Sequence, residues 1–208
     1  MESNWAAEHL QVIRTLMERS AIYRRALSPV TLLVGGLGTV AGLVGWRLQI
    51  ALDVRFAGYW LGVSALALAG AYFLIRRQAV KDGEPFWSPP TRRVTQALVP
   101  AFFAGFVGAV ALLGSLYRGR DLVHWLPPIW MVLYGCAIHA AGFFMPRGIR
   151  LFGWGFILCG CGLLLILTSQ KDPAKLVSPH LVMAAFFGSL HLAYGVYLHF
   201  TEKRKNEA

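Results

Sequence analysis

Charge is scarce in this sequence. Asp, Glu, Lys and Arg make up 14% of its 208 residues, whereas a soluble domain carries about 25%. The charges lie almost entirely outside six apolar stretches, each of about twenty residues and so long enough to cross a bilayer as a helix. The composition therefore excludes a sizeable soluble domain and predicts an all-α, polytopic membrane protein. We expect a six-transmembrane-helix bundle with spans at 29–46, 56–75, 97–117, 125–145, 151–169 and 181–200.

Acidic and basic residues are absent from the middle of every predicted span. Carriers coupled to protons or ions usually keep an ionisable residue there, so their absence disfavours coupled transport. The sequence also lacks a serine nucleophile with a paired base, paired carboxylates and a glycine-rich phosphate loop. These absences disfavour an enzyme, and we predict no catalytic residue.

Cysteine is rare, and all three cysteines fall inside predicted spans: Cys136, Cys159 and Cys161. Cys159 and Cys161 are two residues apart on a helix and therefore point to nearly opposite sides. They cannot share a metal ion, so we interpret the cysteines as small apolar side chains and predict no metal site.

Basic residues outnumber acidic ones and give a formal net charge of +10. Four Lys or Arg precede the first span, five lie in the loop 76–96, two lie between spans four and five and three lie in the tail, which makes fourteen on one side. The other three loops carry two each, which makes six. The positive-inside rule then places both termini in the cytoplasm. We attribute the basic balance to topology and to anionic lipid headgroups, and expect no direct nucleic-acid partner.

Residues 1–28 are predicted to form an amphipathic cytoplasmic or interfacial helix. Apolar side chains, among them Ile13 and Leu16, recur at steps of three and four residues, with charged residues mostly on the other face. One interpretation is a helix that lies in the membrane interface. The alternative is a docking helix for a partner or a second copy of the chain, with Ile13 and Leu16 facing that partner.

The cytoplasmic loop 76–96 combines aromatic and basic residues. The candidate partner-facing residues of this loop are Trp87, Arg92 and Arg93. The alternative is that they only anchor the loop at the membrane interface, a depth that Trp and Arg favour. The membrane domain is assigned to residues 29–200, and residues 201–208 are predicted to be a basic cytoplasmic tail.

Small residues recur at four-residue spacing in the predicted spans. Such pairs allow helices to approach closely and predict either a tight bundle or a homodimer seam. The pairs are Gly38/Gly42, Gly58/Gly62, Ala104/Gly108 and Ala184/Gly188.

Histidine is the main candidate for chemistry inside the membrane. His139 lies within span four and His191 within span six, and His124 and His180 lie at the starts of the same two spans. His180 and His191 are eleven residues apart, which returns an α-helix to the same face within about 20°. Paired histidines on two parallel helices can bind b-type haem, with His139 and His191 as the principal ligands.

Two other interpretations of the histidines stay open. They can hydrogen-bond neighbouring groups and serve packing alone, or they can belong to a polar site for a small ligand. In either case Tyr134, Tyr194 and Ser189 are the candidate lining residues, because they lie on the same spans.

A short repeated sequence indicates an internal duplication. The run 101–105, Ala-Phe-Phe-Ala-Gly, resembles the run 185–188, Ala-Phe-Phe-Gly. With three spans in each half, the repeats would be inverted, as in several transporter folds.

Four segments resemble a group of uncharacterised bacterial six-span membrane proteins. They are residues 10–20, 91–93, 133–135 and 190–195, and the similarity extends over most of the chain. The resemblance implies a multi-pass protein of the bacterial inner membrane with a cytoplasmic regulatory protein as partner. It implies no activity and carries no catalytic residue.

The function expected from the sequence is non-enzymatic. We predict a membrane sensor or binding protein for a small or lipidic ligand that signals to a cytoplasmic partner through residues 3–27 and 76–96. One alternative is a haem-binding membrane electron carrier that uses His139 and His191. Another is a small uncoupled transporter or channel.

Overall fold

The fold is seen in a computed structural model that describes residues 26–51, 54–83, 85–116, 123–145, 148–170 and 177–206. The predicted amphipathic helix, with Ile13 and Leu16, lies outside the described residues. Within the described ranges all regular structure is helical, and six helices are long and apolar enough to cross a membrane. The prediction of an all-α fold with six helices suited to crossing a membrane is therefore confirmed for the described residues.

The six spans agree with the predicted ones but extend beyond most of their ends. They are the helix Ala26–Arg47, α2 (Val54–Lys81), α3 (Pro89–Leu116), α4 (Leu126–Ala141) between the 3-10 turns η1 (Val123–Trp125) and η2 (Gly142–Phe144), α5 (Gly148–Ser169), and a last span. The last span consists of α6 (Pro179–Met183), the π-helical segment η4 (Ala184–Ser189) and α7 (Leu190–Asn206). Because α7 continues through Asn206, the predicted tail begins as a continuation of that helix.

Helix ends occupy most of the segment 76–96 that the sequence indicated as a loop. A turn at Asp82 and Gly83, where Gly83 has a φ of +66°, ends α2, and a short connection then leads to Ser88. The Ser88 carbonyl accepts a hydrogen bond from the backbone N–H of Arg92 at 3.0 Å. The Ser88 and Thr91 hydroxyl oxygens are 3.0 Å apart. Pro89 and Pro90 fit the first helical turn because no intrahelical donor is required there.

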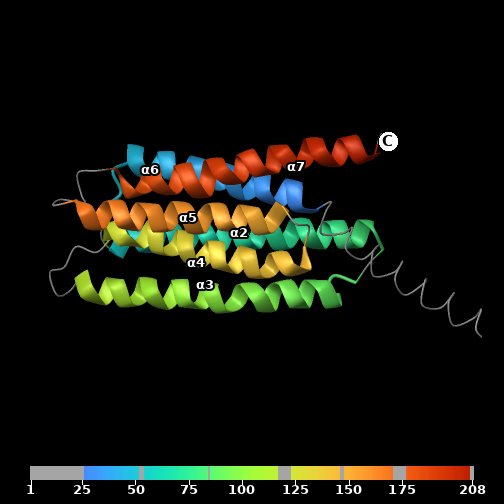
Figure 1. The fold of residues 1–208 in the computed structure, drawn as a ribbon, viewed down its shortest axis with the longest axis horizontal. Helices are drawn as coiled ribbons and strands as arrows, with labels where there is room; N and C mark the ends of the chain where they lie inside the picture. Colours follow the sequence, from blue (N-terminus) through green and yellow to red (C-terminus); the bar gives the residue numbers. More distant parts are fainter. Residues whose placement is uncertain are drawn as a thin grey trace, which may run out of the picture.

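The helices lie side by side along one long axis, with α4 near the centre and α3 on one side (Figure 1). In the α4 span 44% of the apolar stretch is buried, against 6% in α2, which places α2 at the periphery. The end of α7 lies at the same end of the bundle as the turn between α2 and α3 (Figure 1). This is the arrangement expected of six spans that alternate in direction.

The first helix and the last span meet at a seam of glycines, which we call the glycine seam. A Cβ at Gly42 would lie 2.7 Å from the carbonyl oxygen of His180, and one at Gly38 would lie 3.1 Å from the backbone nitrogen of Gly188. The predicted pairs Gly38/Gly42 and Ala184/Gly188 therefore pack on each other. By contrast, a Cβ at Gly58, Gly62 or Gly108 would meet nothing within 4 Å, so these positions lie open.

The π-helical segment η4 (Ala184–Ser189) forms part of this seam. Gly188 of η4 is buried, and a Cβ there would lie 2.7 Å from the backbone nitrogen of Thr39. Bonds from residue i to i+5 wind the chain more slowly than those of an α-helix. The face presented by the last span therefore changes across η4. The inverted repeat is not tested by this arrangement and stays a prediction.

Candidate functional site

A buried histidine and tyrosine meet near the middle of the last span. The Tyr134 hydroxyl of α4 lies 2.6 Å from Nε2 of His191, the second residue of α7. The imidazole of His191 is 1% exposed, which marks it as part of the core. The tautomer of His191 decides which of the two groups donates. Of the three candidate lining residues, Tyr134 is the one that contacts His191 directly.

Aromatic rings enclose this pair. The ring centroids of Phe152, Phe156 and Phe187 lie 5.0, 5.3 and 6.4 Å from that of His191. Tyr134 itself packs edge-on against Phe156 at 5.0 Å. The rings come from α4, α5, η4 and α7, so the enclosure depends on all of these elements. It keeps the hydrogen bond in an apolar environment, where an unpaired polar group would be costly.

Two buried polar atoms beside the pair have no hydrogen bond among the described residues. They are Nδ1 of His191 and the hydroxyl oxygen of Tyr194, one turn further along α7. The backbone carbonyl of Phe187, four residues earlier on the same span, interacts with the His191 imidazole. The Tyr194 ring stacks on Phe152 with centroids 4.5 Å apart. Buried polar atoms are normally bonded, so these two distinguish the His191 centre from the apolar core around it.

His180 forms a second, complete hydrogen-bonding centre near the start of the last span. Nε1 of Trp60 donates to its Nδ1 at 3.2 Å. An indole N–H can only donate, so Nδ1 accepts and the proton lies on Nε2. Nε2 then donates to the carbonyl oxygen of Ile50 at 3.1 Å. Both ring nitrogens are used, and His180 links the last span to α2 and to the end of the first helix.

Local chain geometry prepares the Ile50 carbonyl for this bond. Gln49 adopts a φ of +52°, and the backbone N–H of Ile50 donates to the Gly45 carbonyl at 3.0 Å. The N–H of Gln49 donates to the Trp46 carbonyl at 3.2 Å, which completes a Schellman C-cap. Gly45 also provides space for His180, because a Cβ there would lie 2.8 Å from Cε1 of the imidazole.

His180 and His191 do not share one helix face, contrary to the prediction from their spacing. His180 faces α2 and the first helix, whereas His191 faces α4 and α5. The prediction assumed a regular α-helix between them. The segment η4 winds more slowly and changes the register between the two residues.

His139 and His191 lie on opposite sides of α5. The His139 ring packs against Trp154 at 5.6 Å, whereas the His191 ring packs against Phe152 at 5.0 Å. Residues two apart on an α-helix project in nearly opposite directions. Nδ1 of His139 lies 3.5 Å from the Arg150 carbonyl oxygen, a long contact.

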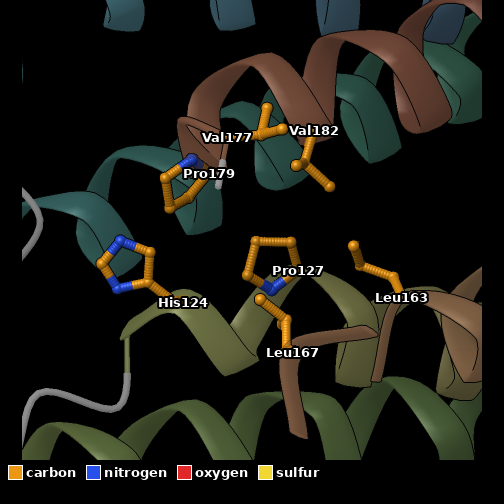
Figure 2. A pocket seen from close by; sticks show the side chains of 7 residues that line it. All are labelled: His124, Pro127, Leu163, Leu167, Val177, Pro179 and Val182. Carbon is orange, nitrogen blue, oxygen red and sulfur yellow. The ribbon is translucent and has the colours of Figure 1, made fainter. Parts of the chain in front are cut away.

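His124 lies at the end of the bundle beside a very small cavity. Figure 2 shows His124 and Pro127 facing Pro179 and Val182 across this space, with leucines of α5 closing one side. The cavity measures about 10 Å³, roughly the room one water molecule needs. His124 thus faces Pro179, while the neighbouring His180 faces α2.

The four histidines do not fit a shared haem in this arrangement. His139 and His191 are separated by α5, and both nitrogens of His180 are bonded to protein groups. The space beside His124 is far smaller than a macrocycle. Within the described ranges, three or more metal-binding side chains do not gather at any one place.

The remaining candidate residues lie apart from the His191 centre. Ser189 is exposed at the end of η4 and does not line the centre. Trp87, Arg92 and Arg93 are exposed at the end of the bundle that carries the α2–α3 turn. There they border a cleft of about 340 Å³ together with Pro89 and Gln96.

Sequence reasoning missed Trp60, Ile50 and the three phenylalanines around His191. Trp60 carried a usable signal, because an indole N–H inside a span needs an acceptor. The Ile50 carbonyl carried none, since its role depends on the turn that ends the first helix. Compared with family models, with curated proteins and with solved structures, the chain shows no match.

Proposed function

We propose that this chain is a membrane-embedded sensor or binding protein for a small or lipidic ligand, and that it signals to a cytoplasmic regulatory protein. The observation that carries the proposal is the His191–Tyr134 pair placed directly after η4. π-helical segments inside α-helices occur frequently at functional sites. Here the segment adjoins the buried polar side chains of His191 and Tyr194.

Signal transmission is proposed to follow the glycine seam. At Gly38, Gly42 and Gly188 the first helix and the last span approach with only small side chains, such as Thr39 and Ala184, between their backbones. A change in the register of η4 would therefore shift the first helix, which leads back to residues 3–27. The end of the bundle that carries Trp87, Arg92 and Arg93 is the second cytoplasmic surface in this proposal, at which ligand binding would be communicated to the partner.

The proposed location is the bacterial inner membrane, with both termini in the cytoplasm. Its support is the distribution of Lys and Arg over the loops. This orientation can be tested with single cysteines at Lys81 and Leu48. The three native cysteines of the chain are first replaced by alanine. Both positions are exposed and lie on opposite sides of the predicted membrane. We expect an impermeant maleimide to label Leu48→Cys in intact spheroplasts and Lys81→Cys only after lysis. The reverse labelling pattern would show that the termini lie on the opposite side of the membrane.

Sensing is tested by distances between the helices. Spin labels at Lys81→Cys and Thr201→Cys report the relation between α2 and α7 in nanodiscs. We expect the distance distribution to differ between discs of phosphatidylcholine alone and discs that also contain phosphatidylglycerol. Tyr134→Phe should reduce that difference, because it removes the hydroxyl from the centre. Identical distributions in both discs would contradict sensing of the anionic lipid.

A further inference from the structure

The end of the bundle at the α2–α3 turn carries a basic cleft that the histidine centres do not involve. Its lining residues are Trp87, Pro89, Arg92, Arg93 and Gln96, and its volume is about 340 Å³. This volume falls in the range of about 300–1,000 Å³ typical of small-molecule sites. None of the five lining residues is acidic, and neither Arg92 nor Arg93 pairs with a carboxylate in the part of the chain that the structure describes. The cleft is therefore built for an anion.

Aromatic contacts hold the walls of this cleft. Phe86 packs edge-on against Tyr72 of α2 at 5.0 Å, and Trp87 lies 6.4 Å from Phe86. The guanidinium of Arg93 lies 6.0 Å from the centroid of the Phe144 ring, within reach of a cation–π contact. Trp87 is nevertheless 59% exposed, so its ring is available to a ligand at the membrane interface.

Side chains, more than the helix terminus, would recognise the anion. Pro89 and Pro90 remove two of the N–H groups that a helix start normally offers, and the N–H of Arg92 is already bonded to Ser88. The two guanidinium groups remain, and guanidinium matches the geometry of phosphate oxygens.

An apolar stripe on α3 continues from the cleft toward the middle of the membrane. Exposed residues follow Arg92 and Gln96 at steps of three and four along one helix face, at Val99, Phe103, Phe106 and Val110. A charged cleft that continues into a lipid-facing apolar stripe matches a molecule with an anionic head and an acyl chain. A soluble anion would need only the cleft.

We propose that this cleft binds the anionic headgroup of a phospholipid, with an acyl chain along the stripe on α3. The proposal rests on the proposed sensing function and names its ligand class. Arg92 and Arg93 would bind the phosphate, and Trp87 would cover the glycerol region at the interface.

The test is retention of phosphatidylglycerol against phosphatidylcholine by the full chain in native mass spectrometry. We expect Arg92→Gln/Arg93→Gln to lower the preference for phosphatidylglycerol about twenty-five-fold, since each arginine near the surface contributes roughly fivefold. The matched control is Arg76→Gln/Arg77→Gln, which removes the same charge from exposed positions on α2 outside the cleft. At physiological salt this control should lose only a few-fold, because diffuse attraction is screened.

Several outcomes would overturn the proposal. An equal loss in both double variants would mean diffuse attraction without a site. Displacement of the lipid by inorganic phosphate alone would mean a site for a soluble anion. An unchanged preference in Arg92→Gln/Arg93→Gln would mean that the cleft serves another partner. If that variant does not fold, Arg92→Lys/Arg93→Lys keeps the charge and should lose part of the preference, because lysine lacks the guanidinium fork.

The two proposals can fail separately. If phosphatidylglycerol binds at the cleft but the distance between α2 and α7 does not respond, the site is real and the sensing function is wrong. If the distance responds equally in Arg92→Gln/Arg93→Gln, sensing is real and the lipid acts elsewhere.

Discussion

Two sets of glycine pairs with identical spacing occupy opposite environments in this bundle. Gly38 and Gly42 meet the backbone of the last span, whereas Gly58 and Gly62 have open space where a Cβ would lie. Spacing of four residues puts small residues on one helix face in both cases. Four-residue spacing of glycines therefore permits a close contact between helices, but it does not show which of the glycine pairs makes such a contact.

The largest expected effect comes from filling the glycine seam. Gly188→Val should destabilise the bundle by about 3 kcal/mol or more, because its Cβ would lie 2.7 Å from the Thr39 nitrogen and backbone cannot yield as a side chain can. The apparent melting temperature in detergent measures this loss. Gly62→Val is the matched control and should change the melting temperature little. Similar losses in the two variants would remove the distinction between seam and outer face.

The next effect concerns the hydrogen bonds at the end of the seam. His180→Ala should cost about 2–4 kcal/mol, because Trp60 Nε1 and the Ile50 carbonyl each lose a buried partner. Thermal unfolding of the purified protein measures the cost. His199→Ala, at an exposed position of α7, should leave stability almost unchanged. If Trp60→Phe and His180→Ala cost as much together as the sum of the two alone, the two residues are not coupled.

The smallest effect is expected on the other side of the last span. Tyr134→Phe should cost about 0.6–1.7 kcal/mol, the range found for hydrogen bonds between membrane helices. The ring contacts with Phe156 and Phe187 persist in this variant, so the packing changes little. Chemical denaturation in mixed micelles measures the cost. A loss above that of His180→Ala would make the His191 centre the main structural link and weaken its proposed functional role.

The histidines show how far sequence reasoning could reach. Their location in or beside spans was predictable, and Tyr134 was one of three candidate lining residues on those spans. That Tyr134 contacts His191 only the structure shows. The faces of His180 and His191 were not predictable, since a π-helical segment leaves no periodic signal in composition. The partner of His180 depends in addition on the turn at Gln49, whose left-handed conformation places the Ile50 carbonyl.

The sequence by itself determined that this chain is an all-helical, six-span membrane protein, because only long apolar helices satisfy the backbone inside a bilayer. Proline, glycine and clustered charge indicated roughly where the spans are joined, but not the helix ends, since α2 and α3 extend into the segment 76–96. Only the tertiary structure decided which glycines pack against another helix and which histidines have both ring nitrogens hydrogen-bonded. It also decided that Arg92 and Arg93 border one cleft with Trp87. The reason is physical: a span's length and apolarity are local properties, whereas its partners depend on the rotation of every helix about its own axis.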